Sequence, residues 1–208
     1  MSRKILSSNR RGHGLQMLIA VAVLIVTSLP IKRFGVSDFE SDIFYGINGL
    51  PDLLNIPMQV VMQLGNFLIV PVAALIAAAL RRFRMAADLF VAGTGAWLLA
   101  KLVKQVVIRG RPAELLTDVI LRGTPGTGHG YVSGHAATAA ALAAVITPYL
   151  RPRVRIVVWT GAALVAIARI YVGAHLPLDV VGGAAMGWAI GSLIHFLFGP
   201  PDPTPAAA

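Results

Sequence analysis

The sequence contains no cysteine and little charge. Without cysteine the chain has no disulfide bond, no thiolate metal site and no cysteine nucleophile. Only 13% of its 208 residues are charged, whereas soluble domains carry roughly 25%. In contrast, 56% of the residues are hydrophobic and the mean hydropathy is +0.74. We therefore expect an integral membrane protein with a single domain.

Acidic residues are also scarce, since nine Asp and Glu stand against 18 Lys and Arg. The formal net charge of +9 is compatible with nucleic-acid binding, but no basic face interleaved with aromatic residues accompanies it. Ten of the basic residues instead flank apolar stretches: Arg3, Lys4, Arg10, Arg11, Arg81, Arg82, Arg84, Arg151, Arg153 and Arg155. Alternating spans place them all on one side of a membrane, and such basic segments mark the cytoplasmic side. The expected partner is the bilayer, not nucleic acid.

Six stretches approach the about 20 apolar residues that a bilayer-crossing helix needs. They are residues 14–31, 56–80, 85–103, 133–150, 156–174 and 176–198. The predicted fold class is all-α, a polytopic bundle of about six transmembrane helices with both termini in the cytoplasm. Residues 1–13 form a basic cytoplasmic N-terminus, 14–198 the membrane domain and 199–208 a disordered cytoplasmic tail. The first stretch lacks a small-residue cleavage site, so we interpret it as a retained helix.

Residues 37–55 lie on the outer side in this topology and carry an apolar stripe. Its members are Phe39, Ile43, Phe44, Ile47 and Leu50. The spacing predicts a short interfacial helix that lies on the outer surface, and we prefer a plain connector to a gate for lipid. A second pattern, Gly183, Gly187 and Gly191, predicts a smooth helix face for close packing.

Charged residues within apolar spans cost energy, so their positions are informative. They gather at the outer ends of the predicted spans, and with them stand serine, glycine and histidine: Lys104, Arg111, Ser133, Gly134, His135, Arg169, His175 and Asp179. A helix N-terminus binds anions through its free N–H groups, and arginine matches phosphoryl oxygens in two-point contacts. The eight residues therefore predict a phosphate site at the outer face of the bundle.

The two histidines indicate catalysis. Asp179 follows His175 by four residues, which lets its carboxylate reach the imidazole across one helical turn. This is the arrangement of an activated nucleophile, and His135 is placed to protonate a leaving alkoxide. Arg169 lies six residues before His175, about 9 Å along a helix, so we expect its long side chain to reach up to the same level.

Metal and nucleotide chemistry are disfavoured by the same residues. Metal-dependent phosphoryl transfer needs several carboxylates, whereas Asp179 is the single acid in this group. The glycine-rich residues 123–130 lack the Gly-Lys-Ser/Thr of a nucleotide-binding loop. We expect no metal and no cofactor, and we interpret residues 123–130 as a loop that caps the site.

Three motifs resemble the membrane branch of the type 2 phosphatidic acid phosphatase superfamily, which also includes the vanadium haloperoxidases. They are KQVVIRGRP from Lys104, VSGH with Val132 in place of proline, and ARIYVGAHLPLD with Ala168 in place of serine. The resemblance covers about residues 55–198 and implies an all-helical bundle. It implies that His175 attacks phosphorus to form a phosphohistidine, Asp179 orients it and His135 protonates the leaving group. The phosphoryl oxygens would be held by Lys104, Arg111, Ser133, Gly134 and Arg169.

The leading hypothesis is an integral lipid phosphatase of the plasma (inner) membrane that acts at the outer leaflet. Polyprenyl diphosphate, phosphatidic acid and phosphatidylglycerol phosphate all carry a terminal phosphate on an apolar anchor. A phosphotransferase that passes the phosphoryl group to another acceptor remains an alternative. In a non-enzymatic phospholipid carrier, the third hypothesis, the pairing of His175 with Asp179 has no purpose. No feature of the sequence indicates an oligomeric state.

Five further polar residues have plain interpretations. We expect His195 to be packed or hydrogen-bonded and His13 to be solvated. Arg109 and Arg122 are expected to be exposed loop cations that at most steer anions, because exposed charges contribute little. His129 borders the predicted site, and we interpret it as an ordinary loop residue.

Overall fold

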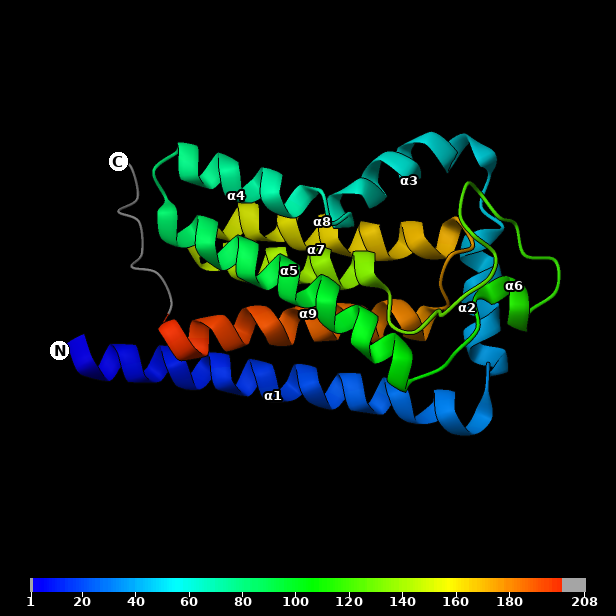
Figure 1. Ribbon diagram of the computed structural model, residues 1–208, viewed down its shortest axis with the longest axis horizontal. Helices are drawn as coiled ribbons and strands as arrows, with labels where there is room; N and C mark the ends of the chain where they lie inside the picture. The colour runs from blue at the N-terminus through cyan, green and yellow to red at the C-terminus, as the bar shows by residue number, and fades with distance from the viewer. Residues whose placement is uncertain (1, 200–208) are drawn as a thin grey trace.

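The computed structural model describes residues 2–199, and within this range the regular secondary structure is entirely helical (Figure 1). The long helices run along the bundle: α1 (Ser2–Phe34), α4 (Ile69–Ala79), α5 (Phe83–Val106), α7 (Gly134–Ile146), α8 (Pro152–Tyr171) and α9 (Pro177–Phe198). The shorter α-helices are α2 (Asp38–Asn48), α3 (Asn55–Met62) and α6 (Pro112–Leu115). Three 3-10 turns join them, η1 (Asp52–Leu54), η2 (Gln63–Gly65) and η3 (Thr147–Tyr149). The all-α prediction is confirmed.

The two ends of the bundle differ in what they carry. The start of α1, the connection between α4 and α5, the start of α8 and the end of α9 lie at one end (Figure 1). The first three of these segments hold the clustered basic residues. At the other end lie α2, α6 and the long connection between α5 and α7. The predicted tail lies outside the described residues except for Gly199.

Within residues 2–199, four helices are long and apolar enough to cross a membrane alone: Arg11–Ile31 of α1, α5, α8 and α9. The second predicted span is bent by 65° between Asp52–Gly65 and α4, and it counts as a fifth if its halves form one broken span. The bend occurs where Gly65 packs on the His135 carbonyl group so closely that a Cβ would overlap it. The fourth predicted span consists of α7, which has 13 residues, and of η3, which follows it directly and ends at Tyr149. By length and composition alone, the described residues thus give four or five candidate spans, and the exact number of spans stays a prediction.

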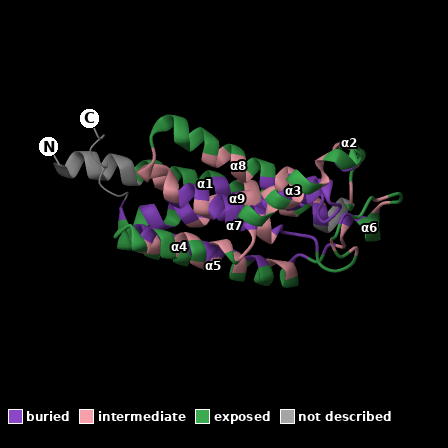
Figure 2. Cartoon of the chain, turned by 90° about the horizontal axis from the view of Figure 1, so that it is seen from above, coloured by how far each residue is buried: buried purple, intermediate pink, exposed green. Residues whose placement is uncertain are grey.

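Helix α7 forms the centre of the bundle and packs closely on α9. Figure 2 shows the buried residues concentrated along these two helices, while the outward faces of the surrounding helices are exposed. A methyl group at Gly187 would overlap the Ala137 carbonyl oxygen, and one at Gly191 would lie 2.5 Å from the Ala144 Cβ. The predicted glycine face is therefore confirmed, and it brings the beginnings of both helices together.

Helix α2 lies across the end of the bundle, as an outer interfacial helix should (Figure 1). The helix buries Phe44 of the predicted stripe together with two polar residues, Glu40 and Asn48. Phe39, at the start of the stripe, is 76% exposed. The Asn48 amide donates to the carbonyl groups of Ile120 and Tyr171, each at 2.9 Å. Polar contacts with the rest of the protein, and not the apolar stripe alone, thus decide which face turns inward.

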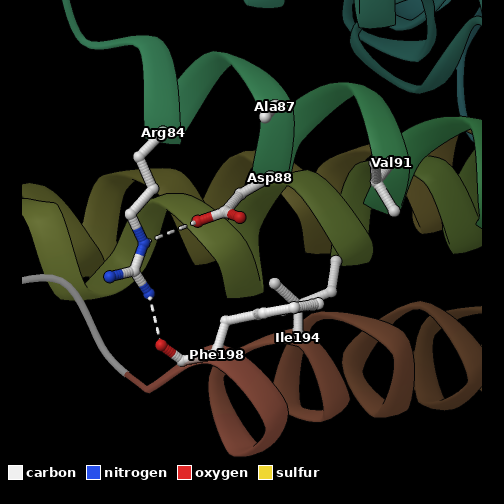
Figure 3. A pocket seen from close by; sticks show the side chains of 6 residues that line it. All are labelled: Arg84, Ala87, Asp88, Val91, Ile194 and Phe198. Atoms are coloured by element: carbon white, nitrogen blue, oxygen red, sulfur yellow. Dashed lines mark hydrogen bonds and ion pairs between the residues drawn. The ribbon is translucent and has the colours of Figure 1, made fainter.

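A cavity of about 470 Å³ lies between α5 and α9 at the end of the bundle that carries the basic segments (Figure 3). It is lined by Arg84, Ala87, Asp88, Val91, Ile194 and Phe198. The Arg84 Nε lies 3.7 Å from the Asp88 carboxylate, and the Tyr149 hydroxyl donates to that carboxylate at 3.2 Å. Since its cation is already paired, the cavity lacks the free positive charge of a phosphate site.

Two histidines meet near this end. The His195 Nε2 lies 3.1 Å from the Val145 carbonyl oxygen, so this residue is packed and hydrogen-bonded as expected. Its ring centroid lies 5.2 Å from that of His13. The expectation that His13 is merely solvated is wrong, because α1 lies along α9 and brings the two imidazoles into contact at a tilt of 45°.

Candidate active site

The beginnings of α7 and α9 are joined directly. The Ser133 N–H donates to the Asp179 carbonyl oxygen at 2.9 Å. The Ser133 hydroxyl caps α7 by accepting from the Ala136 N–H, and the residue is fully buried. A Cβ at Gly183 would overlap the Ser133 carbonyl oxygen, so only glycine permits this approach. The helix that starts at Gly134 therefore begins where the sequence predicts, beside the first turn of α9.

A tight turn brings Arg169 and His175 to the same level. Helix α8 ends at Tyr171, and the Arg169 carbonyl oxygen accepts from the N–H groups of Ala174 at 3.1 Å and His175 at 3.2 Å. Gly173 has a φ of +77°, which favours glycine. The expectation that Arg169 lies below His175 and reaches upward is wrong, because the chain folds back instead of continuing as a helix.

The His175 imidazole faces the Asp179 carboxylate. The Nδ1 atom lies 3.6 Å from Oδ2, and the two side chains are 4% and 0% exposed. The Leu176 N–H donates to the same Oδ2 at 2.9 Å. Burial lowers the pKa of His175 to about 4, although Asp179 opposes this shift. The imidazole is therefore neutral at neutral pH, and with Nδ1 turned to the carboxylate its Nε2 is left for chemistry.

Three cations from different elements surround this pair. Lys104 lies in the last turn of α5, Arg111 precedes α6 and Arg169 lies in the last turn of α8. Electrostatic interactions link these three with one another and with Asp179, and link His135 with Arg169 and His175. The structure thus brings together all eight residues that the sequence predicts for the site.

Some arginine donors at the site have no hydrogen-bond partner in the protein. The Nε atoms of Arg111 and Arg169 are buried without a hydrogen bond. Buried polar groups in proteins are nearly always hydrogen-bonded, so unpaired arginine donors indicate an anionic ligand. Among the residues that the structure describes, no three His, Cys, Asp or Glu side chains gather in a way that could hold a metal ion.

Residues 123–130 are tied across the site by two of its cations. The Lys104 ammonium donates to the carbonyl oxygens of His129 at 2.7 Å and Gly130 at 3.1 Å. The Arg111 guanidinium donates to the Pro125 carbonyl oxygen at 3.0 Å. The His129 side chain is exposed, so this residue contributes its backbone only. An anion that enters the site competes with these carbonyl groups for both cations.

Arg109 is buried beside Asp179, whereas its sequence position predicts an exposed loop cation. It is 4% exposed, and its guanidinium donates to the carboxylates of Glu40 and Asp179. Burial alone would lower the pKa of Arg109, but the hydrogen bond to Glu40 and the two negative charges outweigh burial and raise it. Its position in a loop suggested exposure. The one signal in the sequence for a buried partner is the spacing of Glu40, which lies four residues before Phe44 and therefore on the same face of α2.

Arg122 is also buried, contrary to expectation. Its guanidinium donates to the carbonyl oxygens of Asn48 at 2.7 Å and Tyr171 at 2.9 Å, and to the Asp52 carboxylate at 2.9 Å. The guanidinium carbon also lies 4.1 Å from the Tyr171 ring centroid. Arg122 therefore fastens the loop to the ends of α2 and α8 instead of steering anions.

Proteins with similar sequences are named as phosphatases of lipids. An undecaprenyl-diphosphatase of Sulfolobus acidocaldarius is 29% identical over 184 residues, which cover 86% of this chain and 87% of that protein. A lipid A 1-phosphatase of Rhizobium etli is 35% identical over 105 residues, covering 49% of this chain and 45% of its own length.

Two crystal structures share the fold. LpxE of Aquifex aeolicus has a TM-score of 0.70 with 28% identity, covering 76% of this chain and 96% of that one. The first transmembrane PAP2 type phosphatidylglycerolphosphate phosphatase from Bacillus subtilis has a TM-score of 0.73 with 20% identity, covering 88% and 96%. The sequence model of the PAP2 superfamily matches residues 85–200. This match spans more than half of the chain and includes all eight predicted site residues, so the chain belongs to the PAP2 superfamily.

Proposed function

We propose that this chain, a membrane phosphatase of the PAP2 superfamily, hydrolyses the terminal phosphate or diphosphate of a lipid. The observation that carries the proposal is the cluster of three cations, two with unpaired arginine donors, around a neutral, buried His175 that faces Asp179. Among the candidate substrates we favour a polyprenyl diphosphate, because the undecaprenyl-diphosphatase aligns over most of both chains.

The proposed reaction proceeds in two steps. His175 Nε2 attacks phosphorus, the bond to the leaving oxygen breaks, and His135 gives that oxygen a proton. Water then attacks the phosphohistidine, His135 takes a proton from it, and inorganic phosphate leaves.

The fixed cations would stabilise the charge that spreads over the phosphoryl oxygens: Lys104, Arg111 and Arg169, together with Ser133 and Gly134 at the start of α7. The bound phosphate also brings the negative charge that favours a protonated His135. No step needs a metal ion.

Purified protein in a chelating buffer tests this chemistry. We expect release of inorganic phosphate from polyprenyl diphosphate, phosphatidic acid or phosphatidylglycerol phosphate, measured for each lipid in mixed micelles. Release that appears only after a divalent metal is added would contradict the mechanism. A phosphorylated acceptor that accumulates in place of free phosphate would identify a phosphotransferase.

The active site faces the outside of the cell in this proposal, with both termini in the cytoplasm. The support is the separation of the molecule into one end with the basic segments and an opposite end with the site (Figure 1). Because the chain has no cysteine, single cysteines can report the orientation.

In intact cells we expect a membrane-impermeant maleimide to label Thr127→Cys, in an exposed loop over the site, but not Arg153→Cys at the start of α8. Both positions should be labelled after the membrane is opened, which controls for reactivity. Labelling of Arg153→Cys alone in intact cells would place the site in the cytoplasm.

A further inference from the structure

We propose that Glu40 of α2 is a positioning residue for the reaction, acting through Arg109 on the pair of Asp179 and His175. This inference rests on the proposed function. Glu40 lies outside residues 85–200, the part of the chain that matches the PAP2 superfamily, and α2 is otherwise a connector between α1 and α3. Neither the match nor the sequence motifs assign it a role.

The four side chains form one buried chain of contacts. Arg109 Nη1 and Nη2 donate to the two Glu40 carboxylate oxygens at 3.0 and 2.6 Å. The same Nη1 donates to Asp179 Oδ1 at 2.9 Å, and Asp179 Oδ2 lies 3.6 Å from His175 Nδ1. The Glu40 and Arg109 side chains are each 3% exposed and that of Asp179 is 0% exposed, so water screens none of these interactions.

The Arg109 guanidinium is shared between two carboxylates, and this sharing determines which oxygen of Asp179 contacts His175. Glu40 takes both terminal nitrogens of Arg109, so Asp179 receives a single bond on Oδ1. Its Oδ2 is left to the Leu176 N–H and the His175 imidazole. Without the charge of Glu40, Arg109 would have one anionic partner, and two-point pairing with Asp179 would draw Oδ2 away from His175.

Glu40 also holds the helix that carries Asp179. Its Oε1 accepts from the Leu178 N–H at 3.0 Å, in the first turn of α9. A carboxylate at a helix N-terminus satisfies a free N–H group and interacts favourably with the helix dipole. The charge of Glu40 thus acts on the carboxylate of Asp179 through Arg109 and on its backbone through α9.

The test compares Glu40→Gln with Asp42→Asn, a matched change at an exposed position of the same helix. We expect Glu40→Gln to lower kcat roughly 10-fold or more, because a small displacement of a catalytic pair is costly, with KM within about twofold of wild type. Asp42→Asn should match wild type in both. Each rate is divided by the concentration of folded protein, which is measured by size-exclusion chromatography and thermal unfolding.

Two further variants separate positioning from packing. Glu40→Asp keeps the charge, so it should fold and recover most of the rate, whereas an equal loss in both Glu40 variants would assign the effect to packing. In an Asp179→Asn background, where Arg109 has no second carboxylate to capture, Glu40→Gln should change kcat less than about twofold, since coupled residues are non-additive. A full additional 10-fold loss there would overturn the inference.

The outcomes keep this inference apart from the proposed function. If the wild-type protein releases no phosphate from any lipid phosphate, the proposed function is wrong. If the wild type is active and Glu40→Gln behaves like Asp42→Asn, the function stands and the role of Glu40 is wrong.

Discussion

Replacing His175 by alanine is expected to abolish phosphate release while leaving the binding of a lipid phosphate intact. The imidazole is the proposed nucleophile, and it faces Asp179 at 3.6 Å. Removing the nucleophile of a catalytic triad costs on the order of 10⁴-fold or more in kcat. Binding depends instead on Lys104, Arg111 and Arg169, which the substitution leaves in place. We therefore expect phosphate release at background level and an affinity within a few-fold of wild type.

The comparison needs a control at the same end of the molecule. His129→Ala suits this purpose, because the His129 side chain is exposed and only its carbonyl group contacts Lys104. It should retain wild-type turnover. Binding of both variants can be followed with a lipid phosphate in nanodiscs. Unchanged turnover in His175→Ala would show that His175 is not the nucleophile. Loss of both lipid binding and turnover would show that His175 serves the fold or anion binding instead.

The proposed intermediate gives a second readout for the same variant. A phosphohistidine is a phosphoramidate, which survives base and is lost in acid. Wild-type protein quenched in base during turnover of a radiolabelled substrate should retain label that acid removes. His175→Ala should retain none. Label in both proteins would place the phosphoryl group on another residue.

Much of this site could be predicted because its residues are conspicuous in an apolar chain. Lys104, Arg169 and Asp179 are charged residues at the ends of apolar stretches, where a charge is costly unless it has a functional or structural role. The spacing of His175 and Asp179 is a local property of one turn, and Ser133 is a normal N-cap residue. Contacts between residues that are close in the sequence could therefore be predicted, and the structure places these residues together.

Contacts between distant segments could not be predicted in the same way. Glu40 and Arg109 are separated by 69 residues, and neither carries a mark in the sequence that names the other. The apolar stripe of α2 did not indicate that Glu40 and Asn48 are buried beside Phe44, because their hydrogen-bond partners lie in distant segments. The bend in the second predicted span could not be predicted either, because it arises where Gly65 packs closely on the His135 carbonyl group, which lies far along the chain.

Replacing His135 by glutamine is expected to slow the reaction by an amount that depends on the leaving group. His135 is the proposed acid, and a lipid alkoxide leaves poorly without a proton, so hydrolysis of phosphatidic acid should fall roughly 10²- to 10⁴-fold. The leaving group of a polyprenyl diphosphate is polyprenyl phosphate, which is a much weaker base than an alkoxide. Cleavage of the diphosphate should therefore suffer less than cleavage of the monoester.

The nitrophenolate of p-nitrophenyl phosphate is a still easier case, because it departs without protonation. For His135→Gln we expect the first turnover of this substrate at close to the wild-type rate, seen as a burst of nitrophenolate. The burst should be followed by a slow phase, since the same imidazole is needed as the base that activates water in the second step. Phosphohistidine should accumulate in parallel. An equal loss of the first-turnover rate with alkoxide and nitrophenolate substrates would show that His135 does not act as an acid and holds the phosphate instead.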